Sequence, residues 1–350
     1  AATPALALGT VDAWVLWTLT GATSGGCFAT EPSNASRTLL FDIDRLAWSE
    51  ELCALFGIPT GALPEVQPSA SHFGAVVQGW GLRPGTPVAG VAGDQQAALF
   101  GQACHRPGMA KSTYGTGSFV LMDVGAERPP PTEGLLTTVA WTDHDGPTYA
   151  LEGAVFSTGA AVQWLRDGLG VVVHAAETAA LAASVDSSEG VVVVPAFTGL
   201  GSPWWDPHAR GTIVGLTRGV GRAHLARAVL EAIAFRNRDV VDAMTRASGH
   251  APGALRVDGG AAANDVLLQL QADQLGCRVE RPVVTEATAW GAAGLAGLTV
   301  GVWDSLDEVG ATWQLDRAFE PGPAAADADE AYRRWLRAVE RARGWEVPGP

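Results

Sequence analysis

Four times along the chain, a strand-like apolar run ends at a glycine-rich corner, in GVAGDQQAALFGQ, STYGTGSF, FSTGAAVQW and RVDGGAAAND. Helix-forming sequence follows three of these corners. The corner Gly115-Thr116-Gly117 instead reads as the tip of a β-hairpin within Met109–Gly125, because apolar and polar residues alternate on both sides of it. Strands that alternate with helices and hairpins predict an α/β or mixed α+β fold.

The rest of the chain continues this alternation. Strands are expected at Val88–Val91, Leu136–Trp141, Thr148–Val155 and Val191–Phe197. Amphipathic or small-residue patterns predict helices at Leu8–Leu19, Ser49–Pro59, 94–104, Thr158–Leu169, 223–244, 285–301 and 328–345. The helix at 285–301 is rich in Ala and Gly, which suits close packing against a neighbour.

Composition excludes several classes of protein. A hydrophobic share of 47% with 17% charged residues describes a well-packed globular chain. The net charge of −14 argues against nucleic acid or an acidic membrane as a partner, because such binding needs clustered Lys and Arg. The most apolar run, Val191–Phe197, is too short to span a bilayer, so we expect no membrane insertion.

Cysteine and histidine usage points to an intracellular protein without a histidine-built metal site. The four cysteines show no CxxC spacing, and the seven histidines show no HxxxH or HExxH pairing. The cysteines are therefore interpreted as reduced core residues of a cytosolic protein. The chain opens directly into structured sequence without an initiator Met, so we expect it to start partway into a longer protein.

Two of the corner types could carry chemistry, although each also has a purely structural interpretation. Asp94 is either a helix cap or a general base that accepts a substrate hydroxyl proton. Glycine turns such as Gly115–Gly117 let backbone N–H groups approach phosphate oxygens, yet most such turns are only structural. None of the corners matches the GxxxxGK[ST] or GxGxxG nucleotide motifs.

The motifs in combination are more specific than any of them alone. They occur in the order SNASRTLLFDID, GDQQAALFGQ, STYGTGSFVLM, LEGAVFSTGAAVQWLRD, SPWWDPHARGTIVGLTRG, RVDGGAAANDVLLQLQAD and EATAWGAAGLAG. This series, from about Leu8 to about Val309, closely resembles the glycerol kinases of the FGGY carbohydrate kinase family. The resemblance implies the actin/hexokinase-like (ribonuclease H-like) two-domain α/β fold. It also implies that 1–105 is the remainder of the substrate-side N-terminal domain, 106–300 the nucleotide-side C-terminal domain, and 301–350 a C-terminal helical tail.

The resemblance implies roles for the residues of the first corner. Asp94 corresponds to the catalytic base that contacts the attacking glycerol hydroxyl, and it is a candidate ligand for the Mg²⁺ that accompanies ATP. Gln95 corresponds to an amide that hydrogen-bonds another glycerol hydroxyl, and Phe119 to an aromatic that packs against the glycerol carbons. Gln96 and His208 of WWDPHARG are assigned to structure.

The same resemblance assigns the other corners to ATP. Thr116 corresponds to a hydroxyl near the phosphates, and Gly159 with Gln163 to contacts of the adenine nucleotide. Gly260 and Asn264 correspond to contacts around the α-phosphate and the adenosine. Each polar residue lies about one helical turn after its glycine, so each pair can face one side of a cleft.

The implied function is ATP-dependent phosphorylation of glycerol to sn-glycerol 3-phosphate by a cytoplasmic transferase with ATP and Mg²⁺ as cofactors. A homo-oligomer, dimer or tetramer, is part of this expectation. The alternatives are a kinase of another small polyol or ketose in the same family, and a non-catalytic remnant that binds nucleotide or a partner chain.

The chief departure of the chain from the family pattern concerns motifs that come early in such kinases. It contains neither the family's phosphate-gripping Asp-x-Gly-Thr hairpin nor its early Arg-Glu pair, so we expect the first third of such a kinase to be missing. Elements that would cover apolar surface are then missing too, and an exposed apolar patch is expected. Because losing an electrostatic clamp costs several kcal/mol of transition-state stabilisation, the 350 residues alone are expected to have little activity.

Overall fold

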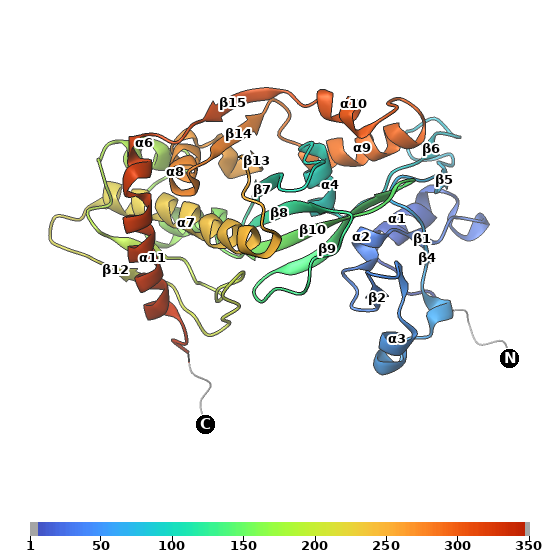
Figure 1. Ribbon diagram of the computed structural model, residues 1–350, viewed down its shortest axis with the longest axis horizontal. Coiled ribbons are helices and arrows are strands. Elements are labelled where there is room, and N and C mark those ends of the chain that lie inside the picture. Colours follow the sequence, from blue (N-terminus) through green and yellow to red (C-terminus); the bar gives the residue numbers. More distant parts are fainter. Residues whose placement is uncertain (1–5, 347–350) are drawn as a thin grey trace.

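The computed structural model describes residues 6–346 and has an α/β architecture built on one mixed sheet. The sheet has the strand order β15-β14-β13-β7-β8-β10-β9 and lies at the centre of the molecule (Figure 1). Its strands are β7 (Ala110–Tyr114), β8 (Ser118–Gly125), β9 (Leu136–Asp143), β10 (Gly146–Val155), β13 (Ala254–Asp258), β14 (Arg278–Pro282) and β15 (Leu315–Phe319). β13 runs parallel to both of its neighbours, β7 and β14, and every other pairing in this sheet is antiparallel.

The hairpin expected at Met109–Gly125 is confirmed. β7 and β8 pair antiparallel with Thr113 opposite Phe119 and Tyr114 opposite Ser118, which leaves Gly115–Gly117 as the tip. The strands expected around Leu136–Trp141 and Thr148–Val155 are also confirmed, as β9 and β10.

Alternate residues of β8 belong to two different cores, as the period of two in a strand requires. Val120 and Met122 pack into the core on the α7 side of the sheet, whereas Leu121 packs with Phe100 and Leu295 on the other side. Both faces of this strand are therefore covered by helices.

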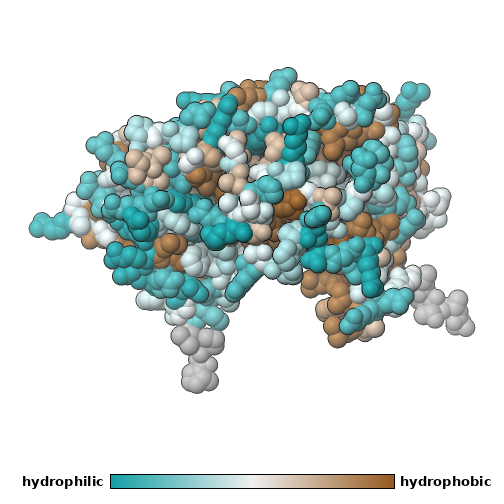
Figure 2. Space-filling view, viewed as in Figure 1, coloured by the Kyte–Doolittle hydropathy of each residue, from teal (hydrophilic) through white to brown (hydrophobic). Residues whose placement is uncertain are grey.

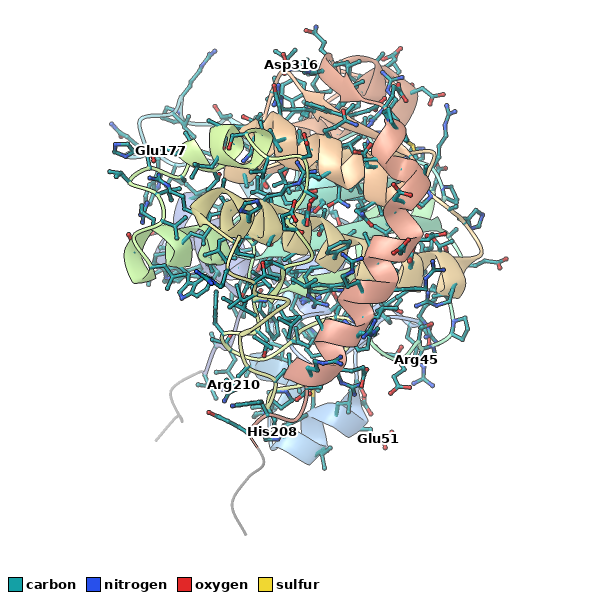
Figure 3. All side chains as sticks on the ribbon, turned by 90° about the vertical axis from the view of Figure 1, so that its left-hand side faces the viewer. Arg45, Glu51, Glu177, His208, Arg210 and Asp316 are labelled. Atoms are coloured by element: carbon teal, nitrogen blue, oxygen red, sulfur yellow. The ribbon has the colours of Figure 1, made fainter. Side chains whose placement is uncertain are left out.

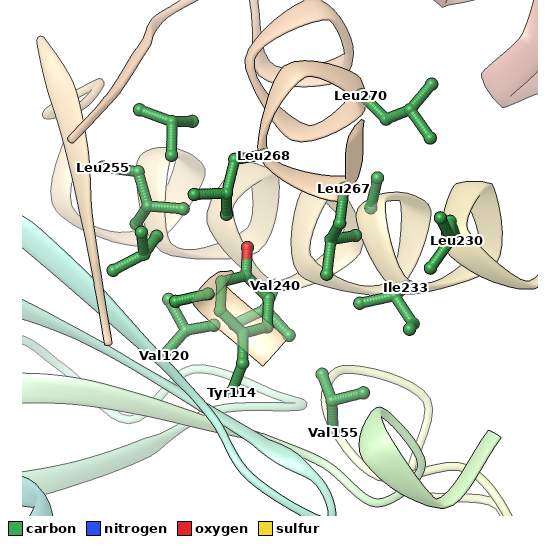
Figure 4. Packing of buried hydrophobic residues seen from close by; sticks show 14 of the residues in the cluster. Tyr114, Val120, Val155, Leu230, Ile233, Val240, Leu255, Leu267, Leu268 and Leu270 are labelled. Carbon is green, nitrogen blue, oxygen red and sulfur yellow. The ribbon is translucent and has the colours of Figure 1, made fainter. Parts of the chain in front are cut away.

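The helix α7 (Arg222–Ser248) covers the first face together with α8 (Asp265–Leu275). Leu230, Ile233 and Val240 of α7 belong to one buried cluster with Tyr114, Val120 and Val155 of the sheet (Figure 4). Burying a side chain of this size stabilises the fold by about 1.5–3 kcal/mol relative to leaving it in water. The remaining helical elements on this side are α5 (Gly159–Gln163), which continues as a π-helical turn at Trp164–Gly168, and α6 (Glu177–Ala183).

The opposite face is covered by α4 (Asp94–Gly101) and α9 (Ala287–Thr299), which pack unusually closely. A Cβ atom at Gly291 would lie 1.8 Å from the Ala97 carbonyl oxygen, and one at Gly101 would lie 2.0 Å from the Ala287 carbonyl oxygen. Only glycine fits at either position, so the expectation that the Ala- and Gly-rich helix packs closely is confirmed.

Smaller elements precede the central sheet and lie at the opposite end of the molecule from α11 (Figure 1). They are α1 (Val11–Leu19), η1 (Ala22–Ser24), β1 (Ala29–Thr30), α2 (Pro32–Ala35), β2 (Phe41–Asp42), β3 (Ala47–Trp48), α3 (Glu50–Phe56), η2 (Thr60–Ala62), β4 (Glu65–Val66), β5 (Gly74–Ala75) and β6 (Pro87–Val88). β1 and β4 form a parallel pair, while β2–β3 and β5–β6 form antiparallel pairs. The predicted cap at Ser49 is confirmed, since its side chain accepts a hydrogen bond from the Leu52 N–H.

The prediction of a strand at Val88–Val91 is wrong beyond Val88. β6 ends there, and residues 89–93 form no strand. The reason is tertiary: at Gly90 a Cβ would lie 2.4 Å from the Ala296 backbone nitrogen, so this segment packs against the backbone of α9 instead of pairing with a further strand.

The segment 301–350 is more than the helical tail that we expected. It contains α10 (Leu306–Ala311), η5 (Pro323–Asp327) and α11 (Ala328–Ala342), but it also adds the edge strand β15 to the central sheet. α11 packs through Trp335 and Val339 on β11 (Val192–Val194), which pairs with β12 (Thr212–Val214). The buried strand expected at Val191–Phe197 is therefore present but shorter.

The surface is mostly hydrophilic on the face drawn in Figure 2, with smaller apolar areas between the polar side chains. Among the described residues, α1 carries exposed apolar side chains, with Val11 77% and Trp14 63% exposed. These two residues line an open hollow of about 650 Å³ with Trp17 and Phe28. This is the kind of apolar patch that the sequence led us to expect. No helix within residues 6–346 has the length and apolar character needed to cross a membrane.

Asp123 gives a prediction about pH and stability. The carboxyl is buried in β8, where burial raises its pKa to about 6 while a hydrogen bond from the Gly125 N–H opposes the shift. The folded state therefore holds this proton through a window in which the unfolded chain, with a pKa near 4, releases it, and stability falls as pH rises through that window.

Asp123→Asn is expected to raise the free energy of unfolding by roughly 2–3 kcal/mol at pH 7.5 and by little at pH 4. Urea unfolding at the two pH values measures the difference. Asp145→Asn, at an exposed hairpin position, serves as the control and should change neither value. An equal effect of Asp123→Asn at both pH values would contradict the assignment.

Candidate active site

The corner at Asp94 lies at the start of α4. Gly93 is the N-cap and Asp94 is the first helical residue, so the structure does not use Asp94 as the capping residue. Its carboxyl is exposed, with Oδ1 accepting the Gln95 N–H at 2.8 Å and Oδ2 accepting from the Gln95 side-chain Nε2 at 3.3 Å. The carboxylate that sequence analysis proposed as a base is thus accessible to a substrate.

A buried glutamate holds this corner in place from a segment sixty residues earlier. Ser33 Oγ accepts the Gly93 N–H at 2.8 Å and donates to Glu31 Oε1 at 2.5 Å. Glu31 is fully buried at the N-cap of α2 and also accepts from both Asn34 nitrogens and from Ser69 Oγ. Burial raises the pKa of Glu31, and these hydrogen bonds oppose the shift.

The two amides beside Asp94 have different environments. Gln96 is buried, and its Nε2 donates to Thr138 Oγ1 on β9 at 3.1 Å, in keeping with the structural role assigned to it. Gln95 is only partly buried, and its Oε1 accepts a hydrogen bond of 2.6 Å from Lys111 Nζ. Gln95 is therefore joined to β7 at the partly exposed side of the corner, and Gln96 holds α4 against β9.

Lys111 joins Gln95 to Phe119. The fully buried ammonium also donates to Thr113 Oγ1 at 2.8 Å and lies 3.5 Å from the Phe119 carbonyl oxygen. The Phe119 side chain is 37% exposed and lines an open hollow of about 390 Å³ with Gly117, Val155, Phe156 and Thr198. Lys111 thus contacts both the Gln95 side chain and the Phe119 backbone.

Sequence analysis missed both Glu31 and Lys111. Glu31 lies in a polar loop that gave no sign of burial. Lys111 could have been noticed in the sequence, because it is the only lysine among the 350 residues.

All five residues predicted to contact the nucleotide line a single cavity of about 420 Å³. Its lining includes Thr116 at the hairpin tip, Gly159 and Gln163 of α5, and Gly260 and Asn264 between β13 and α8. Tyr114, Gly115, Val162, Arg166, Thr178, Leu230 and Leu267 complete much of the wall. Corners that are far apart in the sequence therefore meet at one place.

Glycine is required where these corners touch. A Cβ at Gly159 would lie 2.7 Å from the Gly115 carbonyl oxygen, which accepts the Gly159 N–H at 3.0 Å. Gly259 has φ +83°, and a Cβ there would lie 2.5 Å from the Tyr114 carbonyl oxygen. The absence of side chains lets the three backbones converge and leaves the cavity open.

Asn264 has a structural contact in addition to its place in the cavity wall. Its Oδ1 caps α8 by accepting the N–H groups of Val266 and Leu267, both at 3.1 Å. Its Nδ2 points toward Thr178 Oγ1 at 3.4 Å. The acceptor of this amide is therefore used by the helix, and only its donor is left for the cavity.

The loop containing His208 is structural, as expected. Asp206 Oδ1 accepts the N–H groups of His208 and Ala209, and the Arg210 N–H donates to the Ala342 carbonyl at the end of α11. His208 and Arg210 lie at this end of α11 (Figure 3). His208 does not line the nucleotide-sized cavity.

Comparisons with known proteins find family matches for both halves of the chain. The model of the FGGY family of carbohydrate kinases, N-terminal domain, matches residues 2–101, and that of the C-terminal domain matches residues 110–300. The chain is 54% identical over 347 residues to the glycerol kinase of Bordetella pertussis, covering 98% of this chain and 68% of that protein. It is 53% identical over 339 residues to glycerol kinase 2 of Thermotoga maritima, covering 97% and 67%.

Solved structures of related kinases have the same fold as this chain. The crystal structure of Plasmodium falciparum glycerol kinase with ADP superposes with a TM-score of 0.89 at 37% identity, covering 96% of this chain and 67% of that one. A xylulose kinase from Brucella ovis gives 0.83 at 25% identity, covering 94% and 67%. These matches confirm the α/β, actin/hexokinase-like fold expected from the sequence. The chain spans about two thirds of the length of the relatives that it matches.

The role of Glu31 can be tested by Glu31→Gln. Each Glu31 oxygen accepts a backbone N–H from α2, so either orientation of the amide would set an NH₂ group against one of these donors. We expect a loss of about 3 kcal/mol in the free energy of unfolding, measured by urea denaturation. The exposed Glu65→Gln is the control and should have no effect. Equal stability of the two variants would show that the buried carboxylate does not hold the corner.

Proposed function

Since this chain belongs to the FGGY family of carbohydrate kinases, we infer that it transfers the γ-phosphate of ATP to glycerol, giving sn-glycerol 3-phosphate and ADP. The observation that carries this inference is the 52–55% identity to curated glycerol kinases over 97–98% of the chain. Xylulose and gluconate kinases among the solved structures share the fold at 22–28% identity, so they support a different substrate less strongly.

Asp94 is proposed as the general base. Its carboxylate is exposed at the start of α4, and within residues 6–346 only the neighbouring Gln95 donates to it, so it is free to accept the proton of the attacking glycerol hydroxyl. Gln95 would bind another hydroxyl, and Phe119 would pack against the glycerol carbons from the adjacent strand. These contacts fix the direction from which the hydroxyl oxygen approaches the phosphate.

The nucleotide is proposed to occupy the cavity of about 420 Å³. Thr116 would lie near the phosphates, Gly159 and Gln163 beside the adenine nucleotide, and Gly260 and Asn264 near the α-phosphate and the adenosine. Lys111 and Thr116 are five residues apart along β7 and its turn, at most about 16 Å in extended chain. The proposal therefore requires the phosphates to extend from the cavity toward the corner at Asp94.

ATP would arrive with Mg²⁺ as part of the substrate. The donor set fits, because Mg²⁺ in such sites takes one or two carboxylates together with phosphate oxygens, and Asp94 offers an exposed carboxylate. The ion supplies charge neutralisation on the phosphates. The protein's own contribution is to position the two reactants and to accept the hydroxyl proton.

Three further elements of the proposal follow from the same assignment. The division at about residue 105 would allow two domains, 1–105 and 106–300, to close around the cleft. An enzyme that consumes ATP and keeps all four cysteines as free thiols suits the cytoplasm. A homo-oligomer, dimer or tetramer, is proposed as its assembly.

The substrate can be tested by a coupled assay of ADP formation with glycerol, xylulose and erythritol. We propose to assay both the 350-residue chain and a fusion that places the unmatched part of the Bordetella pertussis relative ahead of residue 1. Glycerol should give the highest kcat/KM. A clear preference for xylulose or erythritol would favour a different polyol or ketose, and ATP binding without turnover in either protein would favour the non-catalytic alternative.

Asp94→Asn tests the base. The amide keeps the size of the side chain but cannot accept the proton, so kcat should fall by about 10²–10⁴-fold in the active form. The dissociation constant for ADP, measured by calorimetry, should stay within about twofold, since the proposed nucleotide contacts are elsewhere. Asp145→Asn, on an exposed turn, is the control. Retained turnover in Asp94→Asn would remove this residue from the mechanism.

A further inference from the structure

Lysine is used once in this chain, and arginine supplies the other 22 of its 23 basic side chains. That lysine, Lys111, is fully buried, although lysine is the residue type least often found inside proteins unless its charge is compensated. A chain that uses arginine at every other basic position keeps an ammonium at this one site. The choice calls for an explanation in the chemistry of the site.

The geometry around Lys111 suits an ammonium and not a guanidinium. Three protons on Nζ meet three acceptors, namely Gln95 Oε1 at 2.6 Å, Thr113 Oγ1 at 2.8 Å and the Phe119 carbonyl at 3.5 Å. A guanidinium is planar and carries five donor hydrogens, so it would leave donors unpaired in this enclosed space. The pocket is thus built for a compact charge with tetrahedral donors.

The consequence for Gln95 is an amide with a fixed orientation. A free amide presents either its oxygen or its NH₂ group to a ligand, at little cost for exchanging them. Here the oxygen is engaged by Lys111, and the Nε2 lies 3.3 Å from Asp94 Oδ2. Gln95 therefore presents its NH₂ group, and not its oxygen, on the side of Asp94.

We propose that Lys111 is a positioning residue that fixes the Gln95 amide as a hydrogen-bond donor toward the substrate, so that Asp94 is the acceptor left for the hydroxyl proton. This inference rests on the proposed function and refines it. The contact also joins the two family domains, because Gln95 lies in the range matched by the N-terminal domain, 2–101, and Lys111 in the range matched by the C-terminal domain, 110–300. It thereby couples the substrate corner to the strand that leads to the nucleotide cavity.

The charges around Lys111 agree with a protonated amine at neutral pH. Burial lowers its pKa to about 8, and the acids Asp258 on β13, Glu152 on β10 and Asp94 on α4 oppose that shift. Asp258 accepts from Gln102 Nε2, and Glu152 pairs with Arg37. Both acids stay engaged elsewhere and leave the three neutral acceptors to the lysine.

A single lysine makes the test direct. The 350-residue chain labelled with ¹³C,¹⁵N-lysine gives one Nζ signal, which can be followed by NMR against pH. In Gln95→Leu the ammonium loses an acceptor, so the signal should shift and its apparent pKa should fall below the wild-type value. Gln95→Glu should raise the apparent pKa through an ion pair. The exposed Gln78→Leu is the matched control and should leave the signal unchanged.

Binding measurements then test the consequence. Lys111→Met keeps the length of the side chain but frees the Gln95 amide, so glycerol affinity should fall about tenfold by calorimetry. ADP affinity should hold, since the proposed nucleotide contacts are elsewhere. Lys111→Arg is the second variant, and it should not restore wild-type glycerol affinity.

Two results would overturn the proposal. One is a lysine signal that ignores Gln95→Leu, and the other is wild-type glycerol affinity in a folded Lys111→Met chain. In the fusion described above, a wild-type protein that binds ADP but no glycerol would instead contradict the proposed function, and with it the role of Gln95 toward glycerol. The lysine titration distinguishes that case, because the Gln95–Lys111 contact would still be detected.

Discussion

The pairing of β7 with β8 on one side and with β13 on the other is the constraint on which the rest of the site depends. Its register sets Lys111 beneath Gln95 and carries the chain to the tip at Gly115–Gly117. The same register brings Gly259 against Tyr114, so the β13 corner reaches the cavity from the parallel neighbour. Because side chains alternate along a strand, a shift of one residue would exchange the two faces and separate every one of these contacts.

The electrostatic organisation of the site follows from that framework. The chain has a net charge of −14, yet it is proposed to bind a triphosphate. In the proposal, the glycine corners bring the backbone close to the phosphates, where N–H groups attract anions without a lysine or arginine cluster. Where full charges are buried, as at Glu31 and Lys111, each has several hydrogen-bond partners, and both lie behind the residues that would touch substrate.

Close packing decides where the substrate corner lies. α4 and α9 approach through Gly101 and Gly291, and the segment before Asp94 follows the backbone of α9 at Gly90. This contact explains why the apolar run at 88–91 does not continue as a strand, although its composition favours one. It also explains how a helix near the C-terminal end of the sequence supports a carboxylate near residue 94. Apolar composition alone could not distinguish strand pairing from packing against a helix, because both bury the same side chains.

The sequence by itself determined the local elements, since caps, glycine turns and the periods of strands and helices depend on neighbouring residues. The hairpin at Met109–Gly125, the cap at Ser49 and the helix after RVDGG could be predicted for that reason. The candidate residues Asp94, Gln95 and Thr116 came from ordered motifs and their family resemblance. Only the tertiary structure decided that β15 joins the sheet, that Glu31 holds Gly93 through Ser33, and that Lys111 orients Gln95. These contacts join residues that are distant in sequence or on different elements, and their energies come from burial and geometry that no local pattern encodes.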